Sequence, residues 1–220
     1  MALPSAKVRL GWLGPAIVLV GAAVAGLAIW FMTSVRPEAG KIIDTIAIDA
    51  RQSLVVREEM KSDRSFIELR DGDTVKWQAL IPHYAGTKGR PAVAWSDKAV
   101  TVRVERNGRA EVFAFAMHNA SKLGTYRIAA DREPITMHAE GPITMTDNVR
   151  AYELVGGLDW HQLVAVDILR GGGIWKTDLG RAPITSGGVA SGQVWVEQAG
   201  RRRSFDGATG REISDVKPLN

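Results

Sequence analysis

The sequence predicts an all-β domain, a propeller-like array of about four four-stranded blades, preceded by one N-terminal transmembrane α-helix. Three observations predict this organisation. A single uninterrupted apolar run lies near the N-terminus. Beyond it, short segments alternate apolar and polar residues with a period of two, which is typical of half-buried β-strands. These segments recur in units of similar length, which is typical of a repeat fold.

The apolar run predicts a transmembrane helix over residues 13–33. Leu13–Met32 contains no charged residue, and twenty residues that each rise about 1.5 Å are enough to cross a hydrocarbon core of roughly 30 Å. Trp12 lies at one edge of the run, and Trp30 and Phe31 lie at the other. Aromatic rings favour the membrane–water interface, so we expect these three side chains to lie there.

A cleaved secretory signal is the alternative interpretation of this run. The run is longer than a signal core of about 7–15 residues, and it ends in bulky side chains where a cleavage site needs small ones. We therefore expect an uncleaved signal anchor. Lys7 and Arg9 lie on its short side, whereas acidic and basic residues mix on the other. The positive-inside rule then predicts a cytoplasmic tail over 1–12 and a periplasmic β-domain at a bacterial inner membrane.

Small residues four apart occur twice within the predicted helix, and they could pack it against another membrane helix. Gly21 precedes Ala25, and Ala22 precedes Gly26. Such pairs let a second helix backbone approach closely. The alternative is that Gly and Ala are simply common in membrane helices.

A linker over 34–44 and a β-domain over 45–220 follow the helix. The linker contains Pro37 and Gly40, which are typical of irregular segments. Four units of the domain share the order strand, tight polar turn, strand, hairpin, strand, polar turn, strand, and they cover residues 46–80, 93–128, 143–179 and 187–213. Their first turns begin at residues 50, 97, 147 and 191, in steps of 47, 50 and 44. Propeller blades recur every 40–50 residues or so.

Alternation within the second unit predicts how its strand is buried. In Ala99–Glu105, Val100, Val102 and Val104 alternate with Thr101 and Arg103. This pattern predicts one face toward a core and one face toward water.

The third and fourth units resemble the PQQ-type propeller repeat. The similarity runs from Ala165 to Val196 and continues through RSFDGATGREI. The turn residues that carry it are Asp167 with Gly173 and Asp206 with Gly210. The family tryptophan is Trp175, with Trp77 and Tyr126 at the matching places of the first two units. The resemblance implies that these aromatic side chains wedge between adjacent blades.

Blade number departs from this family, whose members usually have about seven or eight blades. With room for four, the chain could form a small closed ring, an open arc, or half of a ring that two copies complete. Because natural proteins cover unpaired strand edges, we expect closure, within the chain or through a partner. Family members that have lost the cofactor serve as scaffolds, and we expect no cofactor here because no metal site or catalytic carboxylate can be assigned.

Composition and spacing exclude several kinds of chemistry. The chain has no cysteine, which excludes disulfides, thiolate metal sites and cysteine nucleophiles. The four histidines, His83, His118, His138 and His161, lack metal-ligand spacing. No nucleophile elbow occurs, and Gly171–Gly173 has the character of a hairpin turn and not of a phosphate-binding loop. The net charge of +4 is modest. We predict no catalytic site, no metal site and no nucleic-acid partner.

Three segments supply candidate partner contacts. They are the connection between units one and two, the hairpin of unit three, and a basic run in unit four. The candidate residues are His83, Tyr84, Lys88, Arg90, Trp160, Arg201, Arg202 and Arg203. Long loops on rigid scaffolds often bind partners. The alternatives are a plain connection between blades, a tryptophan folded back onto its own blade, and a solvated strand edge.

These observations predict a non-catalytic, membrane-anchored accessory or assembly subunit. Its periplasmic domain would contact other subunits of an inner-membrane complex, which could be photosynthetic, respiratory or envelope-related. The expected partners are the lipid bilayer, the other subunits and, with two copies completing a ring, a second copy of the chain. The alternative function is a periplasmic domain that binds or senses a small molecule in the central channel.

Overall fold

A computed structural model describes residues 20–22, 24–26, 37–62, 64–81, 91–106, 109–128, 143–157 and 159–213. The chain divides into two compact units, Met1–Glu38 and Ala39–Asn220. In the first unit, residues 20–22 and 24–26 are helical and exposed. Among the residues that the structure describes, no helix is both long and apolar enough to span a bilayer. Most of the predicted span 13–33, with Trp12, Trp30 and Phe31, lies outside the described residues, so the anchor stays a prediction.

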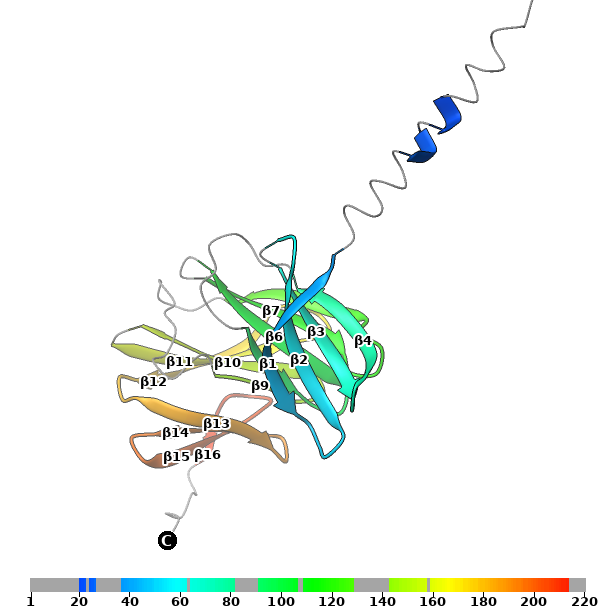
Figure 1. Cartoon of the computed structure of the whole chain (residues 1–220). Coiled ribbons are helices and arrows are strands. Elements are labelled where there is room, and N and C mark those ends of the chain that lie inside the picture. The colour runs from blue at the N-terminus through cyan, green and yellow to red at the C-terminus, as the bar shows by residue number, and fades with distance from the viewer. Residues whose placement is uncertain are drawn as a thin grey trace, which may run out of the picture. The chain divides into compact units, whose positions relative to one another are not determined.

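The second unit contains four four-stranded antiparallel sheets, here called blades 1 to 4 (Figure 1). Blade 1 consists of β1 (Ala39–Ala47), β2 (Gln52–Glu59), β3 (Ser65–Asp71) and β4 (Thr74–Ile81). Blade 2 consists of β5 (Ala92–Trp95), β6 (Ala99–Arg106), β7 (Arg109–Ala116) and β8 (Lys122–Ile128). Blade 3 consists of β9 (Thr144–Thr146), β10 (Arg150–Gly157), β11 (Trp160–Asp167) and β12 (Gly173–Gly180). Blade 4 consists of β13 (Ile184–Ala190), β14 (Gln193–Gln198), β15 (Arg201–Asp206) and β16 (Glu212–Ile213). The all-β, propeller-like prediction is confirmed.

Blade 1 begins earlier than the sequence predicted. The predicted linker over 34–44 includes residues 39–44, which form the first part of β1. Pairing with β2 explains the difference, because the Arg57 guanidinium donates from Nε and Nη2 to the Gly40 carbonyl at 2.9 and 2.7 Å. The Arg57 side chain thus fixes residues 39–44 in the sheet, although the Pro and Gly content of residues 34–44 is typical of a linker.

Aspartates close the last turn of blades 3 and 4, as predicted. Asp167 Oδ1 accepts the backbone N–H groups of Leu169 and Arg170, both at 2.8 Å. These bonds hold the pKa of the Asp167 carboxyl below its usual value. The glycines at positive φ in this turn are Gly171, at 71°, and Gly172, at 127°. The predicted Gly173 instead begins β12, because the turn needs its left-handed residue directly after the segment that the aspartate caps.

Three hydrophobic clusters fill the three interfaces between consecutive blades. An aromatic side chain on the last strand of each of blades 1 to 3 crosses to the next blade. Trp77 Nε1 donates to the Met117 carbonyl at 2.6 Å, and Trp175 Nε1 donates to the Gly207 carbonyl at 3.0 Å. Tyr126 Oη donates to the Ile168 carbonyl in the same manner. The prediction that these three residues wedge between blades is confirmed.

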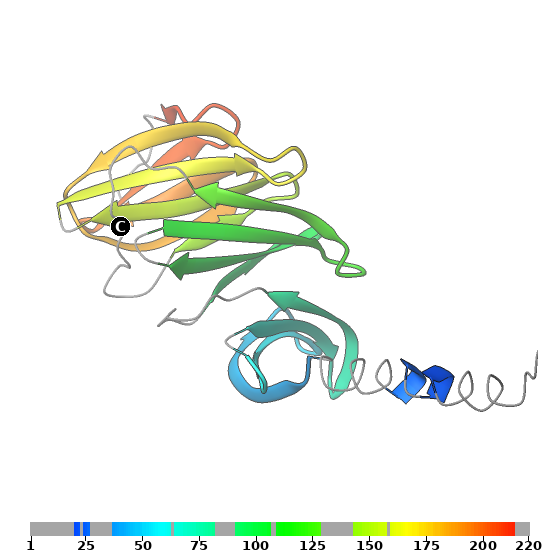
Figure 2. The same cartoon turned by 90° about the horizontal axis from the view of Figure 1, so that it is seen from above.

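The blades follow one another in an open arc (Figures 1 and 2). Inner strand β9 packs against β5 on one side and β13 on the other. Among the described residues, no hydrophobic cluster joins blade 4 back to blade 1. The described residues therefore do not form the closed ring that was one of the expected arrangements.

Charged side chains lie on the outward faces of the two terminal blades. On blade 1, the buried Glu68 carboxylate pairs with Arg70 at 2.8 Å and with Arg57 at 3.8 Å. On blade 4, the Arg202 guanidinium lies 4.0 Å from the centre of the Trp195 ring. Terminal repeats of stacked arrays need polar outer faces for solubility. The charged side chains on the two terminal blades meet part of this need, and closure through a partner stays a prediction.

Candidate functional site

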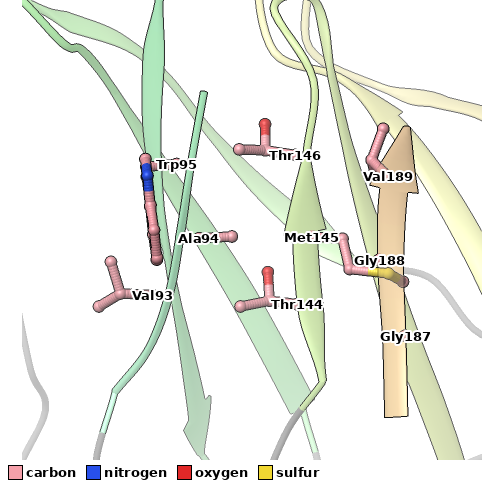
Figure 3. A pocket seen from close by; sticks show the side chains of 9 residues that line it. All are labelled: Val93, Ala94, Trp95, Thr144, Met145, Thr146, Gly187, Gly188 and Val189. Atoms are coloured by element: carbon pink, nitrogen blue, oxygen red, sulfur yellow. The ribbon is translucent and has the colours of Figure 1, made fainter. Parts of the chain in front are cut away.

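A groove on the inner side of the arc is the candidate site (Figure 3). It has a volume of about 370 Å³. The inner strands β5, β9 and β13 each supply three residues: Val93, Ala94 and Trp95; Thr144, Met145 and Thr146; Gly187, Gly188 and Val189.

The three strands present equivalent positions to the groove. The central residue of each triplet, Ala94, Met145 or Gly188, pairs in register with Thr101, Tyr152 or Trp195 on the next strand. One blade position, repeated three times, therefore builds the lining. Trp95 is 36% exposed and supplies the large aromatic surface.

Side chains from β9 point toward both neighbouring blades. Thr144 and Thr146 point toward β5, whereas Met145 points toward Gly188 (Figure 3). A Cβ atom at Gly187 would lie 2.9 Å from Met145 Sδ, and one at Gly188 would lie 2.7 Å from the Trp195 ring. Close packing of Met145 and Trp195 thus requires glycine at both positions.

The lining carries no charge, and its hydroxyl groups are already bonded. Thr144 Oγ1 donates to Glu153 Oε1 at 2.6 Å, and Thr146 Oγ1 donates to the Arg150 carbonyl at 2.8 Å. None of the nine lining residues is an acid, a base or a histidine. In the described part of the chain, no group of three potential metal ligands occurs. General acid–base and metal-assisted chemistry both depend on groups of these kinds.

A buried charge cluster lies behind Thr144, between blades 2 and 3. The Arg103 side chain is fully buried and donates from Nη1 to the Leu154 carbonyl at 2.5 Å and to Glu153 Oε2 at 3.4 Å. Its Nη2 donates to Glu105 Oε1. Its Nε finds no hydrogen-bond acceptor among the described residues. Burial raises the pKa of the Glu153 carboxyl to about 7, and the opposing charge of Arg103 limits the rise.

This cluster corrects the prediction that Thr101 and Arg103 face water. Both side chains are buried, at 0% and 1% exposure. Blade 3 stacks on this face of β6, so both faces of the strand are covered. The alternating pattern distinguished the two faces of the strand, but it did not indicate that blade 3 covers the face of Thr101 and Arg103.

The predicted partner contacts fall into three groups. His83, Tyr84, Lys88 and Arg90 lie outside the described residues. Trp160 is only 8% exposed and packs in the cluster between blades 2 and 3, and its role as a partner contact stays a prediction. The sequence places Trp160 at a hairpin tip, where exposure is expected, but the neighbouring blade covers its side chain.

The three arginines of the basic run in blade 4 differ in their surroundings. Arg203 forms a paired salt bridge with Glu212, with Nε–Oε1 and Nη2–Oε2 distances of 2.8 Å, and this bond raises the pKa of Arg203. Arg201 and Arg202 are exposed. The helical residues Gly21, Ala22, Ala25 and Gly26 are exposed too, and their predicted helix packing stays a prediction.

Sequence inspection missed the groove. Its residues are small or apolar and have no motif. Aligned by their first turns, 93–95 and 187–189 fall at the same distance from the turn, but 144–146 lies one residue nearer to it. The shared position of the three triplets follows only from their pairing with β6, β10 and β14, and the sequence gives no sign that they face an open groove.

No protein-family model matches the chain, and no curated protein matches it either. In fold it is similar to BamB from Moraxella catarrhalis, with a TM-score of 0.46, 12% identity, and coverage of 76% of this chain and 50% of that one. It is similar to the Dos1 propeller, with a TM-score of 0.49, 12% identity, and coverage of 80% and 48%. The computationally designed Ika4 protein is similar with a TM-score of 0.46, 13% identity, and coverage of 76% and 91%. The chain spans about half the length of BamB and of the Dos1 propeller.

Proposed function

We propose that this chain is a non-catalytic, membrane-anchored accessory or assembly subunit of a larger inner-membrane complex. Its propeller-like domain binds other subunits from the periplasmic side. The observation that carries the proposal is the uncharged groove on the inner strands of an open arc. A concave, largely apolar site with an exposed aromatic residue supports binding.

The PQQ-like repeat resemblance supports a scaffold role. Asp167 and Trp175 occupy the turn and wedge positions of that repeat. The groove lining offers no carboxylate and no cation, so it does not suit an acidic quinone cofactor or its metal. We therefore propose a member of the cofactor-less, scaffold type.

The anchor is part of the proposal. The apolar run over 13–33 would hold the domain at the outer face of the inner membrane. Gly21, Ala22, Ala25 and Gly26 would pack against a helix of another subunit. A photosynthetic, respiratory or envelope complex would be compatible with this arrangement.

Mild detergent extraction of the native protein, followed by size-exclusion chromatography and mass spectrometry, tests the proposal. We expect a large complex with a fixed set of partners. Substituting Trp95→Ala should weaken retention of those partners, because the groove loses its aromatic contact. Ile174→Ala is the matched control, since Ile174 is also an exposed apolar side chain, at 42% exposure, but lies on the outer strand β12. A lone monomer in the native extract would contradict the subunit proposal.

Small-molecule binding is the second candidate function, and the groove volume favours it. A volume of about 370 Å³ lies within the range of small-ligand sites, roughly 300–1,000 Å³. Thermal unfolding of the full chain in detergent, measured against a panel of neutral apolar compounds, tests this function. A compound that raises the midpoint of the wild-type protein but not of Trp95→Ala would support it.

A further inference from the structure

The inner strands have backbone N–H and C=O groups on an edge that no other strand pairs with. Each inner strand is the first strand of its sheet and pairs with one neighbour only. In an antiparallel ladder, residues alternate between those bonded to the neighbour and those whose N–H and C=O groups point to the other side. The residues of the second kind on β5, β9 and β13 therefore direct backbone donors and acceptors toward the inner side.

Backbone hydrogen bonds near the turns identify these residues. On β5, the N–H of Ser96 donates to the Ala99 carbonyl at 2.8 Å, so Val93 and Trp95 point their backbone groups inward. On β9, the N–H of Asp147 donates to the Arg150 carbonyl at 3.0 Å, so Thr144 and Thr146 do the same.

Strand β13 offers the most accessible of the three edges. A two-residue turn at Ser191 and Gly192, with φ values of 51° and 77°, closes its hairpin. In such a hairpin the residues flanking the turn are bonded to each other, so Gly187 and Val189 point their backbone groups inward. Residues 186–189 of β13 are all half-buried, whereas Ala94 of β5 and Met145 and Thr146 of β9 are buried.

We infer that the groove binds an extended peptide segment with uncharged side chains, which adds a strand to the inner edge of β13. The ligand chemistry follows from the lining. Backbone groups offer hydrogen bonds at a spacing of two residues, and Trp95, Met145 and Val189 offer apolar contact. A charged side chain would find no counter-charge among the nine lining residues. Strand addition to an exposed sheet edge is an established mode of peptide recognition. The inference rests on the proposed function, because it gives the chemistry of the partner segment.

Matched peptides provide the first test. The probe is a fluorescein-labelled acetyl-Thr-Val-Thr-Val-Thr-amide, and its control is the same peptide N-methylated at both valines. The control keeps the side chains but loses the two valine N–H donors, which lie on one edge of an extended peptide. Fluorescence polarisation with the full chain in detergent should show saturable binding of the first peptide, and binding of the second should be weaker by about tenfold or more. Equal binding, or binding of neither peptide at millimolar concentration, would overturn the inference.

Matched variants provide the second test. Val189→Pro removes an N–H that points into the groove and takes no part in the ladder with β14, which is the place where an edge strand tolerates proline. Val189→Ala trims the same side chain and keeps the N–H. We expect Val189→Pro to lose about tenfold or more in peptide binding and Val189→Ala to stay within about threefold. Circular dichroism melts show whether both variants fold. If Val189→Pro does not fold, the peptide pair on the wild-type chain still decides.

Failure of this inference can be told from failure of the proposed function. If the native complex forms and the peptide pair binds equally, the subunit role stands and strand addition fails. If the native protein is a lone monomer but the peptide pair discriminates, the groove recognises peptides and the subunit role fails. If a neutral compound competes with the probe and also stabilises the fold, with equal binding of the two peptides, the groove is a small-molecule site.

Discussion

Two neighbouring interfaces of the array solve the same packing problem with different chemistry. Between blades 3 and 4, Tyr152, Trp175 and Phe205 form an apolar contact, and the Tyr152 and Trp175 ring centres lie 5.9 Å apart. Between blades 2 and 3, the fully buried Arg103 pairs with Glu153 and Glu105. Stacking buries one face of each sheet whatever its residues are, so a charged residue on that face must find its counter-charge inside. The charged interface is therefore sensitive to pH and to loss of one partner, whereas the apolar one depends on packing.

Arg103→Ala has the largest expected effect. It leaves the Glu153 carboxylate buried without its cation, and removal of one partner from a buried ion pair costs about 3–5 kcal/mol. We expect the free energy of unfolding of the full chain to fall by that amount in a urea titration at pH 8. A loss below about 1 kcal/mol would show that the cluster is accessible to water and that the two interfaces do not differ as described.

The pH dependence of stability comes next in size. The pKa of Glu153 is about 7 in the folded chain, against an ordinary value of 4.5. Between these values the folded state holds a proton that the unfolded state has released. Stability therefore falls as pH rises from about 4.5 to 7, by at most about 1.4 kcal/mol per pH unit, and this contribution is constant above pH 7.

Glu153→Gln sharpens this prediction, because glutamine does not titrate and still accepts the Thr144 hydroxyl. Thermal melts of wild type and variant across pH 4.5 to 8 should show that the variant lacks the Glu153 part of the slope. Parallel slopes for the two proteins would rule out Glu153 as its source.

Trp175→Phe tests the apolar interface with a smaller change. Phenylalanine keeps most of the ring but loses the Nε1–H bond to the Gly207 carbonyl, and one such bond contributes about 0.5–1.5 kcal/mol. We expect a loss of that size in chemical denaturation, with no dependence on pH from 5 to 8. A pH-dependent loss would mean that the contrast between the interfaces is wrong.

Arg202→Ala has the smallest expected effect. Arg202 stacks on Trp195 at the solvent-facing end of the array, and a cation–π contact at an exposed site contributes about 0.5–1 kcal/mol. We expect a decrease within that range and a slightly greater tendency to associate, detected by light scattering, because the Trp195 ring is uncovered. An effect as large as that of Arg103→Ala would indicate that this end face is buried by another chain.

Much of the fold, but little of the candidate site, could be predicted from local sequence. The four repeat units, their first turns and the aspartates Asp167 and Asp206 could be predicted, because alternation and turn chemistry act over a few residues. Trp77, Tyr126 and Trp175 could be placed between blades through their repeat positions. The groove could not be predicted, because it depends on backbone edges of segments about fifty residues apart, and side-chain motifs do not report those edges.

The sequence by itself determined that the chain from residue 45 on forms four similar antiparallel units, since strand periodicity and turn residues are local properties. Only the tertiary structure decided that Arg103 and Trp160 are buried, that residues 39–44 belong to a strand, and that β5, β9 and β13 share one groove. Each of these depends on which blade lies against which. Alternation with a period of two distinguishes the faces of a strand, but stacking decides which faces lose contact with water.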